Sequence, residues 1–159
     1  MVDEPANNKN SSPQIELRCT VDRAMLGPLR AFVCNIAREL GFTEQQVCEI
    51  EICVDEVCAN CMEHAYSKTF EREFPNTSRD LFMEVHYRGD EMTVRIIDHG
   101  IGTDAKCLPR ISHIEDYLEK GRENFRGLGL YLIRKFMDRV DFHSAPGKGT
   151  TVVMTKYRR

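Results

Sequence analysis

Two glycine-containing segments carry the residue types that most clearly suggest chemistry. The first is Asp98-His99-Gly100-Ile101-Gly102, and the second, Gly127-Leu128-Gly129-Leu130, begins 25 residues after Gly102. A carboxylate at the end of a strand can accept a hydrogen bond from a purine amino group, while glycines let the backbone approach the base. Glycines that begin a helix expose backbone N–H groups to an anion, which the helix dipole also favours. The pattern therefore predicts a nucleotide site with the base at the first segment and the phosphates at the second.

A third element lies upstream, where Glu56 and Asn60 are four residues apart. On a helix, residues at this spacing share one face. An amide oxygen is a hard ligand suited to magnesium, which usually keeps several waters and binds nucleotide phosphates as well. A carboxylate one turn away can orient or deprotonate a hydroxyl group or a water. The pair predicts Asn60 as a magnesium ligand and Glu56 as a general base.

Each of these segments also has an ordinary structural interpretation. Glu56 and Asn60 fit a polar stripe on an amphipathic helix, and Asp98 fits a loop that leaves a strand. A single Gly-x-Gly at a helix start is weak evidence for phosphate binding. A fourth segment, Gly147-Lys148-Gly149-Thr150, is by itself a tight turn. If the other three segments form a nucleotide site, this turn would place the Thr150 hydroxyl near the purine base.

The cysteines predict packing and not a metal site. Cys58, Cys61 and His64 are spaced like zinc ligands, but a Cys-x-x-Cys pair in the middle of a helix cannot supply four tetrahedral ligands. The seven cysteines are odd in number and fit no disulfide framework. The four in the second predicted helix are therefore expected to be small buried hydrophobic residues in a reducing compartment: Cys48, Cys53, Cys58 and Cys61.

Hydrophobic periodicity predicts the elements that position these segments. Strands are expected at 15–21, 81–87, 92–97, 140–143 and 150–154, with the second and third joined as an antiparallel hairpin by the turn at 88–91. Helices are expected at 25–40, from Thr43 to about 66, and from Gly127 to about 137. Thr43 and Gln46 are spaced as a capping box at the start of the second helix, whose core-facing stripe is Val47, Ile50, Val54, Val57 and Cys61. The first 13 residues are polar and read as a disordered tail, and residues 103–126, between glycines, read as a mobile lid. Partly segregated helices and strands predict an α+β sandwich, with one mostly antiparallel sheet and helices on one face.

Length and charge narrow the class of protein. A chain of 159 residues predicts one domain, over 14–159, and a net charge of −3 gives no reason to expect nucleic acid. The sequence contains no run of about 18 apolar residues, so no membrane span is expected. The first ten residues lack an apolar signal-peptide segment, which favours a cytoplasmic location.

Four segments, taken in order, resemble the motifs of one ATPase superfamily. The run Glu56-Val-Cys-Ala-Asn-Cys-Met-Glu-His-Ala-Tyr66 is similar to the N box of the GHKL, or Bergerat-fold, ATPases. Asp98-x-Gly100-x-Gly102, Gly127-x-Gly129 and Gly147-x-Gly149-Thr150 are similar to their three glycine boxes. Within that superfamily the chain most resembles the anti-sigma-factor serine/threonine-protein kinases of bacterial partner-switching systems, particularly over residues 126–140.

The resemblance implies a function for each part of the predicted site. It implies ATP bound between the helical layer and the lid, with Asn60 on Mg²⁺ and Asp98 on adenine. It implies Glu56 as the base that activates a serine of a small STAS-domain anti-sigma-factor antagonist. The kinase would alternatively hold a sigma factor or a comparable effector. Related kinases commonly pair, so a homodimer is a further expectation, although Leu26, Leu29 and Phe32 serve either a dimer or the core.

Three interpretations therefore remain open at the level of sequence. The first is an ATP-dependent serine kinase that acts on a STAS-domain partner. The second is an ATP-gated regulatory binding module with little or no kinase activity, and the third is an α+β domain with no nucleotide site. Glu56 favours the first, because a protein that only binds needs no base.

Overall fold

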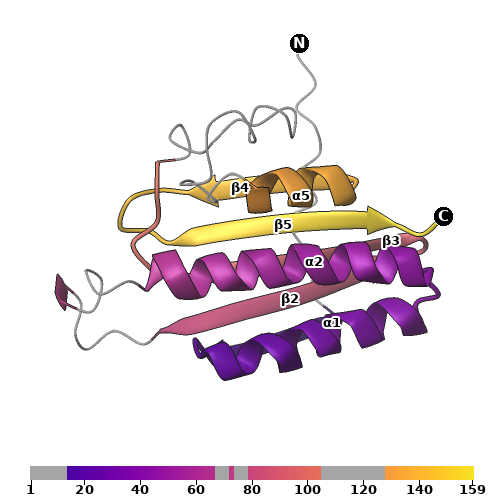
Figure 1. The fold of residues 1–159 in the computed structure, drawn as a ribbon, viewed down its shortest axis with the longest axis horizontal. Coiled ribbons are helices and arrows are strands. Elements are labelled where there is room, and N and C mark those ends of the chain that lie inside the picture. The colour runs from indigo at the N-terminus through magenta and orange to yellow at the C-terminus, as the bar shows by residue number, and fades with distance from the viewer. Residues whose placement is uncertain (1–13, 67–71, 74–78, 105–127) are drawn as a thin grey trace, which may run out of the picture.

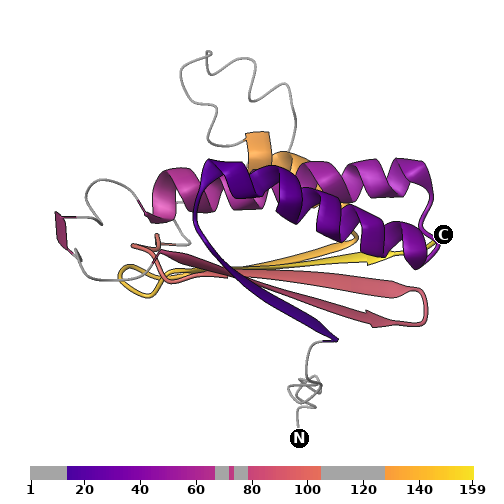
Figure 2. The same ribbon diagram turned by 90° about the horizontal axis from the view of Figure 1, so that it is seen from below.

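The computed structural model describes residues 14–66, 72–73, 79–104 and 128–159. These residues form one five-stranded sheet with three α-helices on one of its faces (Figures 1 and 2). The strands are β1 (Ile15–Thr20), β2 (Asp80–Arg88), β3 (Glu91–Asp98), β4 (Arg139–Ser144) and β5 (Thr150–Tyr157), and the helices are α1 (Leu26–Glu39), α2 (Glu44–Asn60) and α5 (Leu128–Phe136). The predicted α+β sandwich is confirmed. The tail 1–13 and most of the expected lid lie outside the described residues.

The order of the strands brings two of the predicted segments together. The order is β1-β2-β3-β5-β4, and every neighbouring pair is antiparallel. β2 and β3 form the predicted hairpin, in which Gly89 has a φ of +62°. Because β3 pairs with β5 in antiparallel register, Asp98 at the end of β3 lies opposite Thr150 at the start of β5.

The starts and ends of the first two helices follow local signals in the sequence. Helix α1 is followed by Gly41, whose φ is +81° and whose N–H donates to the Arg38 carbonyl at 2.9 Å. A residue in this left-handed conformation ends a helix well, and glycine adopts it without a Cβ clash. Thr43 and Gln46 form the predicted capping box at the start of α2. The Gln46 amide also donates to the Tyr157 carbonyl at 2.9 Å, which ties this end of α2 to β5.

The sequence predicts that the second helix extends to about residue 66, and the helical run does reach Ala65. Its last turn, Cys61–Ala65, is wound as a π-helix. Such turns are rare and often lie at functional sites. Here the Ala65 carbonyl accepts a hydrogen bond from the Ile101 N–H at 2.9 Å. The wider turn therefore connects the end of α2 to the segment that follows β3.

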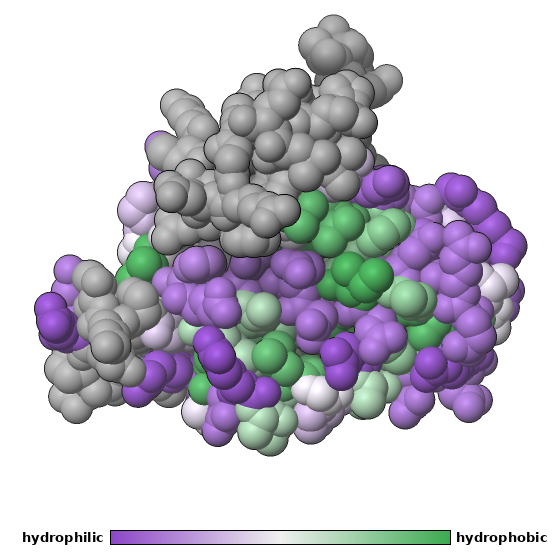
Figure 3. Space-filling model, viewed as in Figure 1, coloured by the Kyte–Doolittle hydropathy of each residue, from purple (hydrophilic) through white to green (hydrophobic). Residues whose placement is uncertain are grey.

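The core lies between the sheet and the apolar sides of the helices. Buried sheet residues include Met83, Val94 and Met154, and the predicted α2 stripe is buried from Val47 to Cys61. On α1, Leu29 is buried, while Leu26 and Phe32 are partly buried and packed against the same core. The helical face is mostly polar, with apolar side chains exposed where α2 and α5 run side by side (Figure 3). Within the described ranges, no helix combines the length and apolar character that a membrane span requires.

One prediction about the cysteines is wrong. Cys53, Cys58 and Cys61 are buried, as expected, but Cys48 is exposed. The cause is helix geometry, because each residue turns the side chain by about 100°. Val47 occupies the core-facing position, so its neighbour Cys48 lies on the outer side of α2.

A buried lysine connects three elements at the end of the molecule opposite the π turn. Lys156 on β5 is only 8% exposed, and its Nζ donates to the Glu49 carboxylate and to the Phe136 carbonyl at the end of α5. Burial alone would raise the pKa of Glu49, but hydrogen bonds from Lys156 and Gln45 hold that pKa below its usual 4.5. The ionised pair therefore stabilises the fold above that pH.

We expect Lys156→Met to lower the free energy of unfolding by about 3 kcal/mol at pH 7, because it leaves a partly buried carboxylate and a helix-terminal carbonyl without their donor. Urea denaturation measures this loss. The difference from the wild type should narrow as pH falls below 4.5, since protonation of Glu49 removes the pair's contribution in the wild type as well. Arg38→Met, which removes an exposed ion pair with Glu44, serves as the control and should change stability little.

Candidate functional site

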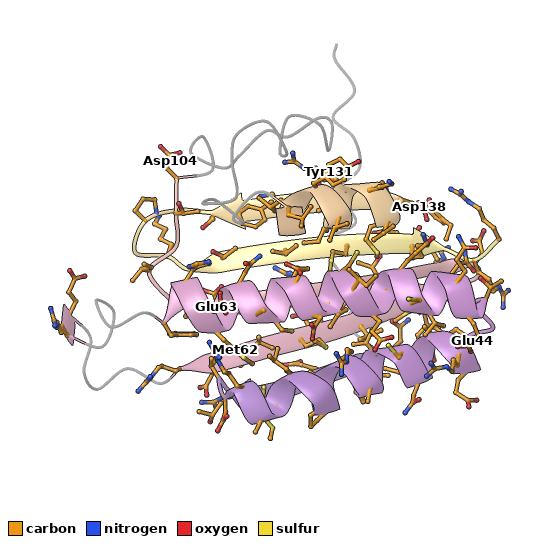
Figure 4. The ribbon with its side chains drawn as sticks, viewed as in Figure 1. Glu44, Met62, Glu63, Asp104, Tyr131 and Asp138 are labelled. Carbon is orange, nitrogen blue, oxygen red and sulfur yellow. The ribbon has the colours of Figure 1, made fainter. Side chains whose placement is uncertain are left out.

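A cavity of about 550 Å³ lies between the end of α2, the start of α5 and the adjoining ends of β3 and β5. Its polar wall comes from the α2 end and the two strand ends, and includes Asn60, Cys61, Glu63, His64, Asp98 and Thr150. Figure 4 shows Glu63 near the end of α2, at the same end of this view as Asp104. All four predicted segments therefore contribute to one cavity, the one at the start of α5 through Leu130 alone.

Asp98 is the most buried charged group in the cavity wall. It is 6% exposed, and its Oδ1 accepts a hydrogen bond from the Gly100 N–H at 2.9 Å. Burial raises the pKa of Asp98, while hydrogen bonds from the Gly100 and Thr150 backbone and from the Cys61 thiol act in the opposite direction. A buried carboxylate held by several donors is well placed to accept one further hydrogen bond from a ligand.

The two glycines after Asp98 differ in their surroundings. Gly102 lines the cavity and has a φ of +62°, and a Cβ there would lie 2.0 Å from the Ala145 carbonyl oxygen. Gly100 does not line the cavity, because it packs against the π turn, where a Cβ would lie 2.2 Å from the Ala65 carbonyl oxygen. Gly100 is therefore required for close packing of the loop that follows β3, whereas Gly102 also forms part of the wall.

Hydroxyl groups hold the segment after β3 against the start of β5. The Thr103 N–H donates to Ser144 Oγ at 2.8 Å, and Ser144 Oγ lies 2.8 Å from Thr150 Oγ1. Thr103 and Thr150 both line the cavity. Sequence reasoning identified Thr150 but missed Ser144 and Thr103, because their connection depends on how β4 pairs with β5.

A buried tyrosine supports the Asp98 loop from behind. The Tyr66 hydroxyl donates to the Asp80 carbonyl at 2.7 Å and accepts from the His99 N–H at 3.0 Å. Burial is the main reason that the pKa of Tyr66 rises to about 12, so this hydroxyl keeps its proton at neutral pH. Tyr66 thereby fixes the backbone next to Asp98 to the start of β2.

Asn60 and Glu56 occupy different places relative to the cavity. Asn60 is exposed at the end of α2 and lines the cavity. Glu56 is half-buried one turn earlier and lies outside the wall, against α5, where a Cβ on Gly129 would be 2.4 Å from Glu56 Oε2. Burial, followed by the charges of Asp55 and Glu63, raises the pKa of Glu56. A carboxylate with a raised pKa accepts a proton more readily.

The residues that the sequence predicts to bind the phosphates lie at or just before the start of α5. Leu128 and Gly129 begin this helix and lie outside the cavity wall, whereas Gly127 lies outside the described residues. Gly129 is buried against Glu56, so its lack of a side chain is what allows that carboxylate to reach α5. The first turn of α5 and Glu56 are thus neighbours.

Sequence reasoning missed the apolar floor of the cavity. The floor is made by side chains from the sheet and from α5, namely Ile96, Phe142, Val152, Leu130 and Ile133. The signal that could have found the sheet residues is their alternation, because residues two apart on a strand point to the same face. Ile96 and Asp98 on β3, and Thr150 and Val152 on β5, are such pairs.

Among curated proteins, the chain is similar to the serine-protein kinase RsbW of Bacillus subtilis, with 29% identity over 94% of this chain and 88% of that protein. It is also 29% identical to the anti-sigma F factor of a Thermoanaerobacter species, over 80% of this chain and 82% of that one.

Two solved structures share the fold. The RsbU and RsbW domains of a Mycobacterium tuberculosis protein align with a TM-score of 0.60 and 17% identity, over 92% of this chain but only 32% of that one. The SiaB–SiaC complex of Pseudomonas aeruginosa aligns with a TM-score of 0.54 and 9% identity, over 91% of this chain and 89% of that one. The family model described as the histidine kinase-like ATPase domain matches residues 19–156, and the chain belongs to this family.

Proposed function

We propose that this protein is an ATP-dependent serine/threonine-protein kinase that phosphorylates a STAS-domain anti-sigma-factor antagonist and sequesters a sigma factor or a comparable effector. The observation that carries the proposal is the placement of Glu56 against the first turn of α5, beside a cavity with a buried carboxylate. Glu56, the candidate general base, thus lies next to the helix start that is expected to bind the phosphates. The names of the curated relatives support both the kinase activity and the regulatory role.

The residues of the cavity fit an adenine nucleotide. Asp98 offers an acceptor to the 6-amino group, and the apolar floor, including Ile96 and Val152, offers a surface for a flat ring. The volume of about 550 Å³ is within the range of ordinary ligand sites. The exposed amide of Asn60 at the cavity wall fits a hard cation such as Mg²⁺. When bound, that ion would neutralise charge on the phosphates.

Residues of this chain would then bind the two parts of the nucleotide. Asp98 binds the adenine ring, and backbone N–H groups at the start of α5 attract the phosphates. Glu56 would accept the proton of the substrate serine as that oxygen attacks the terminal phosphorus of ATP, the bond to the bridging oxygen breaks, and ADP leaves. The raised pKa of Glu56, caused first by burial, suits this role. We place this activity in the cytoplasm, with residues 14–159 as the kinase domain and 103–126 as its lid.

The second candidate is an ATP-gated binding module with little kinase activity. The relative named an anti-sigma F factor favours it, since that name describes binding and not phosphorylation. Incubation with radiolabelled ATP and the cognate STAS-domain protein separates the two functions. Label on the STAS serine supports the kinase, whereas ATP-dependent binding of a partner without label supports the binding module. Absence of magnesium-ATP binding in titration would contradict both.

A homodimer remains a prediction. The candidate surface is β1 with α1, but Leu29 is buried in the core, and Leu26 and Phe32 pack against it. These side chains stabilise the monomer in the described structure. A pairing surface would therefore have to use other residues of the same elements.

We expect Asn60→Ala to abolish magnesium-dependent ATP binding while leaving metal-free ADP binding nearly unchanged. Asn60 is proposed to touch the ion and not the base, and its side chain is exposed, so the substitution should not unfold the helix. Calorimetric titrations of ATP with Mg²⁺ and of ADP with EDTA measure the two affinities. Asn35→Ala, on the exposed side of α1, is the matched control. Equal losses with and without the metal would mean that Asn60 has a structural role.

A further inference from the structure

Three polar side chains lie in one row across strands β3, β5 and β4. Asp98 is paired with Thr150 in the register of β3 and β5, and Thr150 is paired with Ser144 in the register of β5 and β4. Residues directly opposite each other on antiparallel strands have Cβ atoms about 5 Å apart. Asp98 and Thr150 line the cavity, whereas Ser144 is not among the described residues that do. Any effect of Ser144 on a ligand must therefore pass through its neighbours.

The contacts of the Ser144 hydroxyl decide where its hydrogen points. Its Oγ accepts the Thr103 N–H at 2.8 Å, which uses one lone pair. Two acceptors in the described part of the chain then compete for its single hydrogen, namely Thr150 Oγ1 at 2.8 Å and the Gly149 carbonyl at 3.2 Å. Hydrogen bonds from a hydroxyl group to an oxygen are usually about 2.5–3.0 Å long, so Thr150 Oγ1 is the favoured acceptor.

The direction of this bond determines what Thr150 presents to the cavity. A hydroxyl group has one hydrogen to donate and two lone pairs. When Ser144 donates, Thr150 accepts and keeps its own hydrogen for a group in the cavity. The opposite direction would use up the Thr150 hydrogen and leave Ser144 only the longer contact with the Gly149 carbonyl. The cavity wall therefore presents an acceptor at Asp98 beside a donor at Thr150.

We propose that Ser144 is a positioning residue for base recognition, whose hydroxyl donates to Thr150 Oγ1 and so leaves the Thr150 hydrogen to be donated to N1 of adenine. This inference rests on the proposed nucleotide site and deepens it. Adenine carries a donor, its 6-amino group, beside an acceptor, N1. Asp98 and Thr150 complement this pair. A purine with a hydrogen on N1, such as hypoxanthine, would instead bring its own donor against the Thr150 hydrogen.

The role in base recognition can be separated from a role in holding the loop. Removal of the Ser144 hydroxyl also takes away the acceptor of the Thr103 N–H, which lies in the segment after β3. A general loosening of that segment would weaken every nucleotide alike. Loss of an oriented Thr150 hydrogen weakens only nucleotides that carry N1, so the ratio of two affinities distinguishes the two effects.

The test compares ADP with 1-deaza-ADP, in which a C–H group replaces N1. Calorimetry without metal measures both affinities for the wild type, Ser144→Ala and Ser144→Thr, each checked for folding by circular dichroism. In Ser144→Ala, the ratio of ADP to 1-deaza-ADP affinity should fall about 3- to 10-fold, the usual effect of one hydrogen bond. Ser144→Thr keeps the hydroxyl group and should keep the ratio to within about twofold.

Thr93→Ala is the matched control. Thr93 Oγ1 lies 2.9 Å from Thr155 Oγ1, so the same sheet holds a second hydroxyl pair at residues outside the cavity wall. Its loss should leave the ratio at the wild-type value. If Ser144→Ala does not fold, Ser144→Cys takes its place, because a thiol has a similar shape but donates weakly. The ratio should then fall by a smaller factor.

A double-mutant cycle tests whether Ser144 acts through Thr150. Thr150→Val removes the second hydroxyl group and nearly keeps the shape of the side chain, and it should itself lower the ratio of ADP to 1-deaza-ADP affinity. In the Thr150→Val background, Ser144→Ala should then cause no further fall in that ratio. A residue that only supports the loop would have the same effect in both backgrounds.

The outcomes separate this inference from the function on which it rests. Wild-type protein that fails to bind ADP would overturn the nucleotide site and the role of Ser144 together. Wild-type binding of ADP with an unchanged ratio in Ser144→Ala, or in its Ser144→Cys replacement, would overturn the role of Ser144 alone. A fall in the ratio that persists in the Thr150→Val background, or that appears equally in Thr93→Ala, would also overturn it.

Discussion

Glu56→Gln is expected to retain ATP binding and partner binding but to phosphorylate the STAS-domain serine about 10²–10⁴-fold more slowly. A serine hydroxyl is a poor nucleophile at neutral pH, and a positioned carboxylate assists by taking its proton during attack. Glu56 is half-buried on α2, and its Oε2 reaches Gly129 at the start of α5. Glutamine keeps the size and the helix propensity of glutamate, so only the base is removed.

Single-turnover transfer of radiolabel from ATP to the STAS-domain protein measures this effect, with ADP affinity recorded in parallel. Glu51→Gln is the matched control, because Glu51 lies on the same helix in an ion pair with Arg30 and away from the cavity. That variant should transfer label at the wild-type rate. A wild-type rate in Glu56→Gln would reject the proposed base and leave the ATP-gated binding module as the better explanation.

The rate of the wild-type kinase should also depend on the ionisation of Glu56. The carboxylate accepts a proton only when ionised, so transfer should slow as pH falls through its folded-state pKa. Burial, with Asp55 and Glu63 nearby, raises that pKa above the ordinary glutamate value. Glu63, which lines the cavity, supplies part of the charge repulsion that raises the pKa of Glu56. The repulsion disfavours the ionised form of Glu56 and therefore favours transfer of a proton to its carboxylate.

The fold could be predicted because its elements depend on local patterns. Alternation along β3 and the Gly89 turn predicted the hairpin, and the Thr43–Gln46 capping box predicted the start of α2. These signals involve residues only a few positions apart. The prediction failed at Cys48 because it followed the residue type and not the helical position, which puts Cys48 beside Val47 on the outer side of α2.

The site was harder to predict because its contacts join distant segments. Sequence spacing placed Glu56 and Asn60 on one helix, but the approach of Glu56 to Gly129 follows from the packing of α2 against α5. Tertiary packing also determines the π turn and the hydrogen bond from the Ile101 N–H to the Ala65 carbonyl. Motifs therefore identified which segments meet, and the structure identified which atoms do.

Asp98→Asn is expected to weaken ADP and ATP alike, by about 10- to 150-fold, because a charge-assisted hydrogen bond to a buried carboxylate is lost. The neutral amide also fits its surroundings poorly. The Gly100 N–H donates to Asp98 Oδ1, and an amide has one acceptor oxygen in place of two. An amide that keeps this bond turns its NH2 group to the position of the second carboxylate oxygen, where the wild type offers an acceptor.

Calorimetry with ADP in the absence of metal isolates this effect, because neither the magnesium ligand nor the terminal phosphate then contributes. Asp141→Asn is the control, since Asp141 is exposed on β4 and outside the cavity wall. It should bind ADP as the wild type does. The effect must also depend on the base: IDP lacks the amino donor and should lose much less affinity than ADP. A folded Asp98→Asn protein with wild-type ADP affinity would mean that the buried carboxylate serves the loop after β3 and not the nucleotide.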